Sequence, residues 1–413
     1  MSFEKFNFHS KIITGVQALG YTAPTPIQAQ SIPPILNGSD VMGLAQTGTG
    51  KTAAFVLPIM QHLIRGPRRA PRALIIAPTR ELTQQTSKVV GQLGRGTGLR
   101  TISIYGGVNI GQQISALRRG IDIVSACPGR LLDHIQRGTI DVSNIKILVL
   151  DEADLMFDMG FLPDIKKIVK HLPADRQTLL FSATMPDDIK TLAKKILTDP
   201  VMVHIGHTGP VASVEHSFYP VQQDRKTALL KSILCNTETG PVLVFTRTKV
   251  RSKRVARQLE DSGFDATALH GNLSQNKRQQ ALDGFSRGRY KILVATDVAA
   301  RGIDVRKVSH VINYDIPDTI DAYTHRIGRT GRASETGDAF TFVTGSDSFT
   351  ARSIKRVLGN KLKHCAVDGF DIAAEEGTRQ VRNRRPGGQQ NRKKYNPNNR
   401  SRSAAKTKRP SFC

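Results

Sequence analysis

The segment AQTGTGKT occupies residues 45–52, between a short apolar run and an apolar segment with helical spacing. This pattern predicts a phosphate-binding loop at a strand-to-helix turn. Gly48 and Gly50 can adopt dihedrals that aim successive backbone N–H groups at phosphates, and the following helix adds its positive dipole end. We expect Lys51 to reach the β- and γ-phosphates of a nucleotide and Thr52 to offer its hydroxyl to Mg²⁺.

A second motif supplies the acidic group that such a nucleotide site needs. In ILVLDEAD, Asp151 directly follows an apolar run, where a Mg²⁺ ligand beside a phosphate-binding loop is expected. Glu152 is then placed to orient or deprotonate an attacking water, and Asp154 is assigned a coupling role. Without the upstream loop, the same four residues would indicate only a loop or a helix cap.

Short apolar runs recur through both halves of the chain and predict strands buried on both faces, as in parallel sheets. Segments with helical spacing lie between them, for example Glu81–Leu93 and Asp164–Leu172. This alternation predicts two doubly wound α/β domains, and the Gly and Pro residues of Asp199–Ser213 indicate a connector. The expected strands are Ala73–Ala77, Ile121–Val124, Ile147–Leu150, Thr178–Phe181, Pro241–Phe245, Ala266–Leu269, Ile292–Ala295, Val311–Tyr314 and Ala339–Val343.

Length and charge fit two domains and a polyanionic partner. The chain has 413 residues, enough for two hydrophobic cores, and a formal net charge of +26. Residues 378–413 contain twelve Lys and Arg and no acidic residue. This composition predicts a disordered basic tail that binds nucleic acid, with a merely solvated tail as the alternative.

Other classes of protein are disfavoured by composition. No apolar stretch approaches the roughly 18 residues that a membrane span requires, and the N-terminus lacks an apolar signal core. Cys127, Cys235, Cys365 and Cys413 are scattered, which disfavours a zinc site or a disulfide framework. We therefore expect a cytoplasmic protein that contacts no membrane.

The string Asp151–Asp154, with AQTGTGKT upstream, resembles the signature of the DEAD-box RNA helicase family. GYTAPTPIQ, residues 20–28, resembles the family's adenine-recognising Q motif. The resemblance implies that Gln28 binds the adenine edge, Phe3 stacks on its face and Thr25 supports the pocket; a Gln amide can donate and accept across adenine. The nucleotide-binding set so implied is Phe3, Thr25, Gln28, Ala45, Gln46, Thr47, Gly48, Thr49, Gly50, Lys51, Thr52 and Asp304.

Further motifs follow in the family's order. PTREL (78–82), Gly106 with Gly107, and PGR (128–130) resemble RNA-contacting motifs, whose amides and side chains grip phosphates without reading sequence. Cys127 departs from the family, which usually has threonine before PGR. The RNA-binding set implied by the resemblance is Pro78, Thr79, Arg80, Gly107, Pro128, Gly129, Arg130, Gln275, Arg278, Thr296, Asp297 and Arg301.

The second half carries ATDVAARGID (295–304) and HRIGRTGR (325–332). The resemblance implies that Asp304 contacts the ribose, and that Arg329 and Arg332 reach the γ-phosphate when the domains close. Arginines supplied from another domain would make hydrolysis conditional on closure. The coupling residues implied are Asp154, Ser182, Thr184 and His325, with SAT (182–184) linking hydrolysis to strand separation.

The resemblance implies two RecA-like domains that bind ATP and Mg²⁺ in their cleft and RNA across both halves. The expected organisation is a Q-motif region at 1–30, a first domain at 31–204, a linker at 205–213, a second domain at 214–377 and a disordered basic tail at 378–413. DLMFDMGF, which follows the acidic motif, resembles RhlE-type bacterial members of the family.

Two alternatives remain beside an RNA-dependent ATPase that unwinds short duplexes. One is a processive DNA translocase, and the other is an RNA chaperone or clamp without turnover. The expected catalytic set, Lys51, Asp151, Glu152, Arg329 and Arg332, argues against the clamp. The RNA is not identified, because the expected contacts go to the backbone. Candidate partners are ribosomal RNA and RNA-decay complexes.

Overall fold

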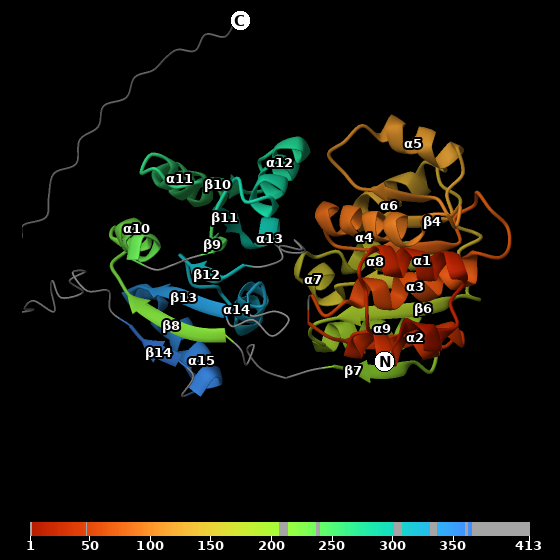
Figure 1. Cartoon of the computed structure of the whole chain (residues 1–413), viewed down its shortest axis with the longest axis horizontal. Helices are drawn as coiled ribbons and strands as arrows, with labels where there is room; N and C mark the ends of the chain where they lie inside the picture. The colour runs from red at the N-terminus through yellow and green to blue at the C-terminus, as the bar shows by residue number, and fades with distance from the viewer. Residues whose placement is uncertain are drawn as a thin grey trace, which may run out of the picture. The chain divides into compact units, whose positions relative to one another are not determined.

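The computed structural model describes residues 2–46, 48–205, 214–236, 240–300, 308–330, 337–359 and 362–365. Two seven-stranded sheets organise these residues, and every pairing between their strands is parallel (Figure 1). The predicted α/β architecture with two parallel sheets is therefore confirmed. The predicted linker, apart from Ile205, and the whole predicted tail lie outside the described residues.

The first sheet has the strand order β3, β4, β2, β5, β6, β1, β7. Its strands are β1 Val41–Leu44, β2 Ala73–Ile76, β3 Thr101–Ile104, β4 Ile123–Ala126, β5 Ile147–Asp151, β6 Gln177–Ser182 and β7 Val201–His204. The helices are η1 Phe3–Phe6, α1 Ser10–Ala18, α2 Pro26–Leu36, α3 Lys51–Leu63, α4 Arg80–Leu93, α5 Ile110–Arg118, α6 Pro128–Gln136, α7 Ala153–Asp158, α8 Leu162–Lys170 and α9 Asp187–Ile196.

The second sheet has the order β10, β11, β9, β12, β13, β8, β14. Its strands are β8 Val214–Pro220, β9 Val242–Thr246, β10 Ala266–Leu269, β11 Ile292–Thr296, β12 His310–Asn313, β13 Gly337–Val343 and β14 Leu362–His364. The helices are α10 Lys226–Asn236, α11 Lys249–Glu260, α12 Gln275–Ser286, α13 Asp297–Ala300, α14 Ile320–Ile327, η2 Gly345–Asp347 and α15 Ser348–Leu358.

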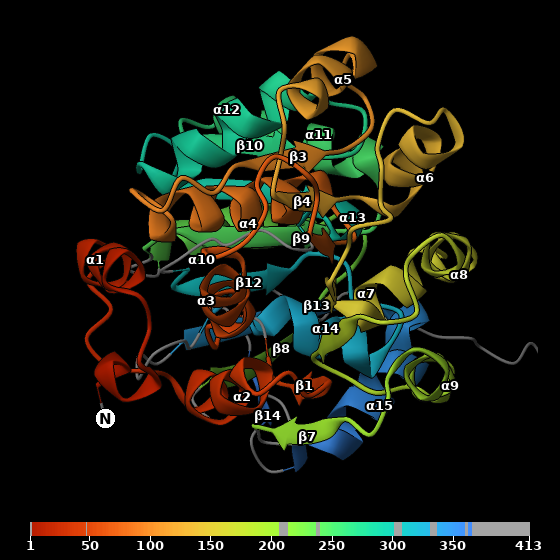
Figure 2. The same cartoon turned by 90° about the vertical axis from the view of Figure 1, so that its right-hand side faces the viewer.

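The central strands are mostly apolar because helices cover both faces of each sheet. In β5, Ile147 and Val149 pack with α1 to α4, whereas Leu148 and Leu150 pack with α6 to α9. Figure 2 shows α1, α2 and α3 on one side of the first sheet and α7, α8 and α9 on the other. Phe3 belongs to the α1 to α4 side, so the Q-motif region packs on the first domain.

The second sheet repeats this division. Val242 and Val244 of β9 pack with α10 and α11, and Leu243 and Phe245 pack with α12 and α13. Helices α14 and α15 pack over β8 and β13. Among the described residues, none of the helices has the length and apolar character needed to span a membrane.

One predicted connector contains a strand. Val201–His204 pairs with β1 as the edge strand β7, although the sequence indicated a connector over residues 199–213. Val201 and Met202 are exposed, so β7 lacks the fully buried pattern of a central strand. Strands β3, β8 and β14 were also not predicted. The domain boundaries derived from the sequence stay a prediction.

A buried carboxylate joins three strands at the amino edge of the first sheet. Asp40, which precedes β1, accepts hydrogen bonds from the backbone N–H groups of Thr178 in β6 and Thr198, each at 2.7 Å. The backbone carbonyl of Asp40 accepts another bond from Val201 of β7 at 2.8 Å. Asp40 therefore holds β6 and β7 on either side of β1.

Replacing this carboxylate is expected to destabilise the first domain. Asp40→Ala leaves the buried N–H group of Thr178 and the partly buried N–H group of Thr198 without acceptors and should lower the free energy of unfolding by about 2 kcal/mol. Urea denaturation followed by circular dichroism measures the change. The control Asp188→Ala removes an exposed carboxylate in α9 and should stay within about 0.5 kcal/mol of wild type. Equal stability of both variants would contradict the role of Asp40.

Candidate active site

The loop of residues 45–52 lies between β1 and α3, at the carboxyl edge of the first sheet. Gly48 and Gly50 have φ values of +87° and +95°, in the left-handed region that favours glycine. A Cβ atom on Gly50 would lie 2.5 Å from Gln28 Nε2, so a larger residue would displace Gln28. Thr47 lies outside the described residues.

Lys51 begins α3 and is buried in the loop. Its Nζ donates to the carbonyl of Ala45 at 3.0 Å and forms an ion pair with Glu152 Oε1 at 3.0 Å. Burial would lower the pKa of Lys51, but the carboxylates of Glu152, Asp151 and Asp154 raise it above its usual value. The ammonium group therefore stays charged where a nucleotide phosphate would lie.

Asp151 and Glu152 follow each other at the end of β5. Asp151 is buried, and its Oδ1 has no hydrogen-bond partner among the described residues. Burial, with repulsion from Glu152, raises the pKa of Asp151 to about 7, although Lys51 opposes the rise. Glu152 has φ +54°, an uncommon value for a non-glycine residue, which turns the chain sharply into α7.

These groups fit a magnesium ion bound together with nucleotide phosphates. A buried carboxylate oxygen of Asp151 without a partner and the hydroxyl of Thr52 are oxygen ligands of the kind Mg²⁺ prefers. The described residues contain no group of three or more His, Cys, Asp or Glu side chains that could hold a metal by themselves. Mg²⁺ commonly takes one or two carboxylates and completes its shell with phosphate oxygens and water, so this donor set is adequate.

Gln28 connects the Q-motif region to the loop. Its Oε1 accepts from the backbone N–H of Thr25 at 3.0 Å, and its Nε2 donates to the carbonyl of Gly50 at 3.1 Å. A glutamine amide has two N–H donors and two acceptor lone pairs. One donor and one acceptor therefore stay available to an adenine edge.

Phe3, expected to stack on adenine, lies in the core. It is 4% exposed, and its ring contacts Tyr21 at 6.4 Å in a stacked arrangement and Phe6 at 6.1 Å edge to face. Tyr21, inside the Q motif, is only partly buried. The sequence reasoning missed Tyr21, although its aromatic ring within GYTAPTPIQ was a usable indication.

The four predicted coupling residues meet at Asp154: Thr184 and His325 contact its carboxylate, and Ser182 contacts its backbone N–H. Asp154 Oδ2 accepts from the backbone N–H groups of Ala183 and Thr184 at 3.1 and 2.8 Å, and from Thr184 Oγ1 at 3.0 Å. Ser182 Oγ accepts from the backbone N–H of Asp154 at 3.1 Å. His325 Nε2, from α14 of the second domain, lies 3.6 Å from Asp154 Oδ2.

The surroundings of Asp154 keep it ionised. Burial would raise its pKa, but the hydrogen bond and charge of His325, the charge of Lys51 and the Thr184 N–H group hold the pKa well below its usual range. The carboxylate is thus a fixed negative charge between the acidic motif, SAT and the second domain.

Two of the predicted second-domain residues have buried or paired side chains in the structure. Asp297, assigned to RNA, binds Arg326 through two hydrogen bonds of 2.6 and 2.7 Å, which commits its carboxylate to an internal pair. Arg326 also donates to Asn313 and to the carbonyl of Asp315. Arg329 is buried, at 5% exposure. Arg301, Asp304 and Arg332 lie outside the described residues.

Residues of the motifs predicted to contact RNA, from both halves of the chain, line one cavity of about 350 Å³. Arg130 donates to the carbonyl of Val108 at 3.2 Å, and the side chain of Arg80 lies against Gly107, where a Cβ atom would be 2.4 Å from Arg80 Nη1. The lining residues are Pro78, Thr79, Arg80, Glu81, Gly106, Cys127, Gly129, Arg130, Met159, Phe161, Gly271, Arg278 and Val298. Thr296 ends β11 and is buried.

Glu81 links the two domains beside this cavity and was not singled out from the sequence. Arg278 Nε donates to Glu81 Oε1 at 2.8 Å, and Gln275 Nε2 donates to the same oxygen at 3.3 Å. All three side chains are buried. The position of Glu81 inside PTREL was the available indication, but its partners lie almost 200 residues further along the chain.

Cys127, which stands where the DEAD-box family usually has threonine, is the N-cap residue of α6. Its Sγ lies 3.3 Å from Thr83 Oγ1, and burial raises the pKa of the thiol to about 11. The side chain is therefore a protonated thiol that packs inside the first domain, and the turn into PGR forms without a hydroxyl at this position.

Comparisons with known proteins agree with this arrangement. A family model described as DEAD/DEAH box helicase matches residues 25–192, and one described as Helicase conserved C-terminal domain matches residues 225–334. The DEAD-box ATP-dependent RNA helicase CshA of Bacillus subtilis is 42% identical over 382 residues, covering 92% of this chain and 77% of the relative. DEAD-box ATP-dependent RNA helicase 30 of Arabidopsis thaliana is 44% identical, covering 86% and 61%.

Solved structures are similar over most of the chain. S. cerevisiae Dbp5 bound to RNA and ADP BeF3 has a TM-score of 0.78 and 31% identity, covering 88% of this chain and 95% of that one. A DEAD box protein from Methanococcus jannaschii has a TM-score of 0.53 and 39% identity, covering 89% and 99%. With both domains matched in order and the P-loop, acidic motif and SAT segment assembled at one sheet edge, the chain belongs to the DEAD-box ATP-dependent RNA helicase family.

Proposed function

We propose that this chain binds RNA across its two α/β domains and couples ATP hydrolysis to local separation of short RNA duplexes. The carboxylate of Asp154 is the observation that carries the proposal. Asp154 lies three residues after Asp151, and its carboxylate contacts Thr184 of the SAT segment and His325 of the second domain. A change at the nucleotide would therefore reach the second domain directly through Asp154.

The nucleotide is assigned to the loop of residues 45–52. Lys51 would contact the β- and γ-phosphates, while Thr52 and Asp151 would hold Mg²⁺, which when bound supplies positive charge against the phosphate oxygens. The remaining donor and acceptor of Gln28 would bind the adenine edge. Because Phe3 is buried behind Tyr21, Tyr21 is the better candidate to contact adenine, with Phe3 supporting its ring.

Glu152 is assigned to proton transfer from the attacking water. Its carboxylate pairs with Lys51 at 3.0 Å. Phosphates that bind Lys51 would replace this partner and leave the carboxylate beside the γ-phosphate. Water then attacks phosphorus, Glu152 accepts the proton and ADP departs, while Arg329 and Arg332 stabilise charge on the transferring group. Asp304 is assigned to the ribose.

Two substitutions separate binding from chemistry. Lys51→Ala should weaken ATP binding at least tenfold, since a buried cation for the phosphates is lost. Glu152→Gln should bind ATP and RNA normally but hydrolyse ATP about a hundredfold more slowly, because the amide accepts no proton. Fluorescent-nucleotide titration and phosphate release measure the two effects.

Glu215→Gln is the matched control, because Glu215 also pairs with a lysine, Lys363, but at an exposed position in the second domain. It should alter neither binding nor turnover. Normal turnover in Glu152→Gln would show that another group accepts the proton.

RNA is assigned to the cavity lined by PTREL, PGR and α12. The expected contacts go to phosphates, which orient a strand without selecting its sequence. Arg278 lines the cavity and uses Nε for Glu81, so its terminal nitrogens can donate to phosphate. Asp297 stays in the proposed RNA set in a positioning role, since its two hydrogen bonds to Arg326 hold it at the end of β11.

Arg278→Ala should raise the RNA concentration for half-maximal ATPase roughly tenfold, because a phosphate contact and the pair with Glu81 are both lost. ATP turnover measured against RNA concentration tests this. Lys277→Ala is the control on the same helix, since Lys277 is exposed and outside the cavity.

A DNA strand of the same sequence serves as the second comparison in this assay. Stimulation by DNA equal to that by RNA would favour the translocase alternative. An unchanged RNA requirement in Arg278→Ala would remove Arg278 from the RNA site.

The sequence of residues 378–413 predicts additional RNA affinity without chemistry. Each phosphate neutralised on a single strand contributes about −0.7 to the slope of log affinity against log salt, so six engaged cations add roughly −4. Deleting residues 378–413 should flatten this slope and leave the ATPase rate at saturating RNA unchanged. If the deletion variant keeps the full salt slope, the tail is solvated and does not contribute to RNA binding.

The geometry of the site does not specify the subtype within the DEAD-box family or the RNA that is bound in the cell. The bacterial relative reported above is named CshA, so the RhlE-type placement gains no support from it. A cytoplasmic location, and ribosomal RNA or an RNA-decay complex as the partner, stay proposals. Crosslinking to RNA in cells, followed by sequencing of the bound fragments, would identify the target.

A further inference from the structure

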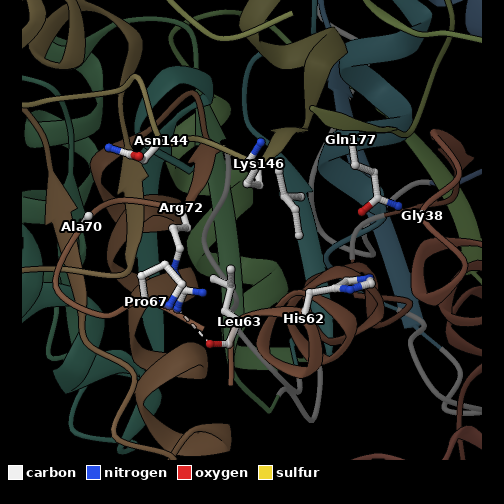
Figure 3. A pocket seen from close by; sticks show the side chains of 10 residues that line it. Gly38, His62, Leu63, Pro67, Ala70, Arg72, Asn144, Lys146 and Gln177 are labelled. Atoms are coloured by element: carbon white, nitrogen blue, oxygen red, sulfur yellow. Dashed lines mark hydrogen bonds between the residues drawn. The ribbon is translucent and has the colours of Figure 1, made fainter. Parts of the chain in front are cut away.

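A second cavity of about 430 Å³ lies at the amino edge of the first sheet. It opens beside the starts of β5 and β6 and the end of α3, and Figure 3 shows the side chains that line it. The lining residues are Gly38, His62, Leu63, Pro67, Ala70, Arg72, Asn144, Lys146, Ile147 and Gln177. Its volume is within the range of small-molecule sites.

This cavity is separate from the nucleotide and RNA sites. Helix α3 runs from Lys51 at the nucleotide site to Leu63 at the cavity, and β5 runs from Ile147 at the cavity to Asp151 at the nucleotide site. The two sites therefore lie at opposite ends of the same elements. None of the residues assigned to ATP, Mg²⁺ or RNA lines this cavity.

The charged residues that line the cavity are cationic. Arg72 and Lys146 contribute positive charge, and no Asp or Glu is among the lining residues. Lys146 is largely exposed, and its partner Asp175, at 3.3 Å, is fully in solvent. An ion pair of this kind is weak, so a ligand anion can compete for Lys146.

Arg72 is an incompletely satisfied buried cation. It is 6% exposed, and its Nη2 donates to the carbonyl of Leu63 at 2.8 Å, the bond drawn in Figure 3. Its Nη1 donates to the carbonyl of Arg65 at 3.4 Å, whereas its Nε, which is inaccessible to solvent, has no hydrogen-bond partner among the described residues. The nearest carboxylate, Asp122, lies 3.7 Å from Nη2 and also accepts backbone N–H groups of Arg69 and Arg100.

Arg72 is a buried cation whose nearest carboxylate lies 3.7 Å away, so an acidic group in the cavity would stabilise its charge. The remaining wall is mostly apolar, formed by Leu63, Pro67, Ala70 and Ile147. A ligand that satisfies both features has an acidic group at one end and an apolar body. A neutral apolar molecule would bring no negative charge to Arg72, and a bare inorganic anion would leave the apolar wall exposed to water.

We propose that this cavity is a binding site for a small organic anion with an apolar body, whose acidic group contacts Arg72 and Lys146. Its apolar body contacts Leu63, Pro67 and Ile147. The site belongs to the first domain alone, so ligand binding does not require RNA.

The probe for the test is 8-anilinonaphthalene-1-sulfonate, an aromatic sulfonate that fluoresces when it leaves water. Titration into the full chain, with saturating ADP to occupy the nucleotide site, should give saturable binding of one molecule per chain. The neutral analogue N-phenyl-1-naphthylamine should bind at least tenfold more weakly, because it offers no acceptor to the two cations.

Substitutions at the rim locate the probe without disturbing the core. Lys146→Glu should weaken probe binding about tenfold by reversing an exposed charge, and Ala70→Trp should weaken it further by filling the cavity. Lys190→Glu is the matched control, because Lys190 is similarly exposed and pairs with the exposed Asp187 at 2.9 Å, away from the cavity. It should bind the probe as wild type does.

Melting curves show whether each variant is folded, and Lys146→Glu supplies the decisive comparison if Ala70→Trp does not fold. Absence of saturable binding would overturn the proposal. Equal affinity in Lys146→Glu and Lys190→Glu, or equal affinity for the neutral analogue, would overturn it as well.

Discussion

The parallel pairing of β1, β6 and β5 is the constraint on which the nucleotide site depends. Its register aligns Leu44 with Ser182 and Asp151 with Phe181. Because parallel strands end at the same edge, the P-loop, the acidic motif and SAT meet there although they are spread over about 140 residues of sequence. Asp40 at the opposite edge secures the strands that set this register.

The same arrangement brings several charged side chains together in the buried nucleotide site. Lys51 and Glu152 form a buried pair, and Asp151 beside them has a raised pKa because of its burial. Buried ion pairs contribute little net stability, since desolvation offsets the attraction. The site is therefore held by the surrounding sheet and not by its own charges, which leaves those charges available to a nucleotide and a cation.

Sequence patterns predicted the features that depend on residues close together in the chain, such as buried strands and short motifs. The runs around β2, β5 and β9 are apolar at every position because both faces are covered, whereas β3 and β7 are partly exposed and lack that pattern. The P-loop was predictable because few residues other than glycine adopt the positive φ values of its turn. The acidic motif was predictable because few side chains other than carboxylates suit a Mg²⁺ ligand at that place. Partners such as Glu81 for Arg278 and Arg326 for Asp297 depend on packing between distant segments, and no spacing rule encodes them.

The thiol of Cys127 lies at the wall of the cavity assigned to RNA. At neutral pH the group is protonated and nearly buried beside Thr83, so an alkylating reagent that enters the cavity should react with it slowly. Cys235 is exposed on α10 and should react faster. These two cysteines therefore label at different rates, and a strand bound in the cavity should protect Cys127 while leaving Cys235 unaffected.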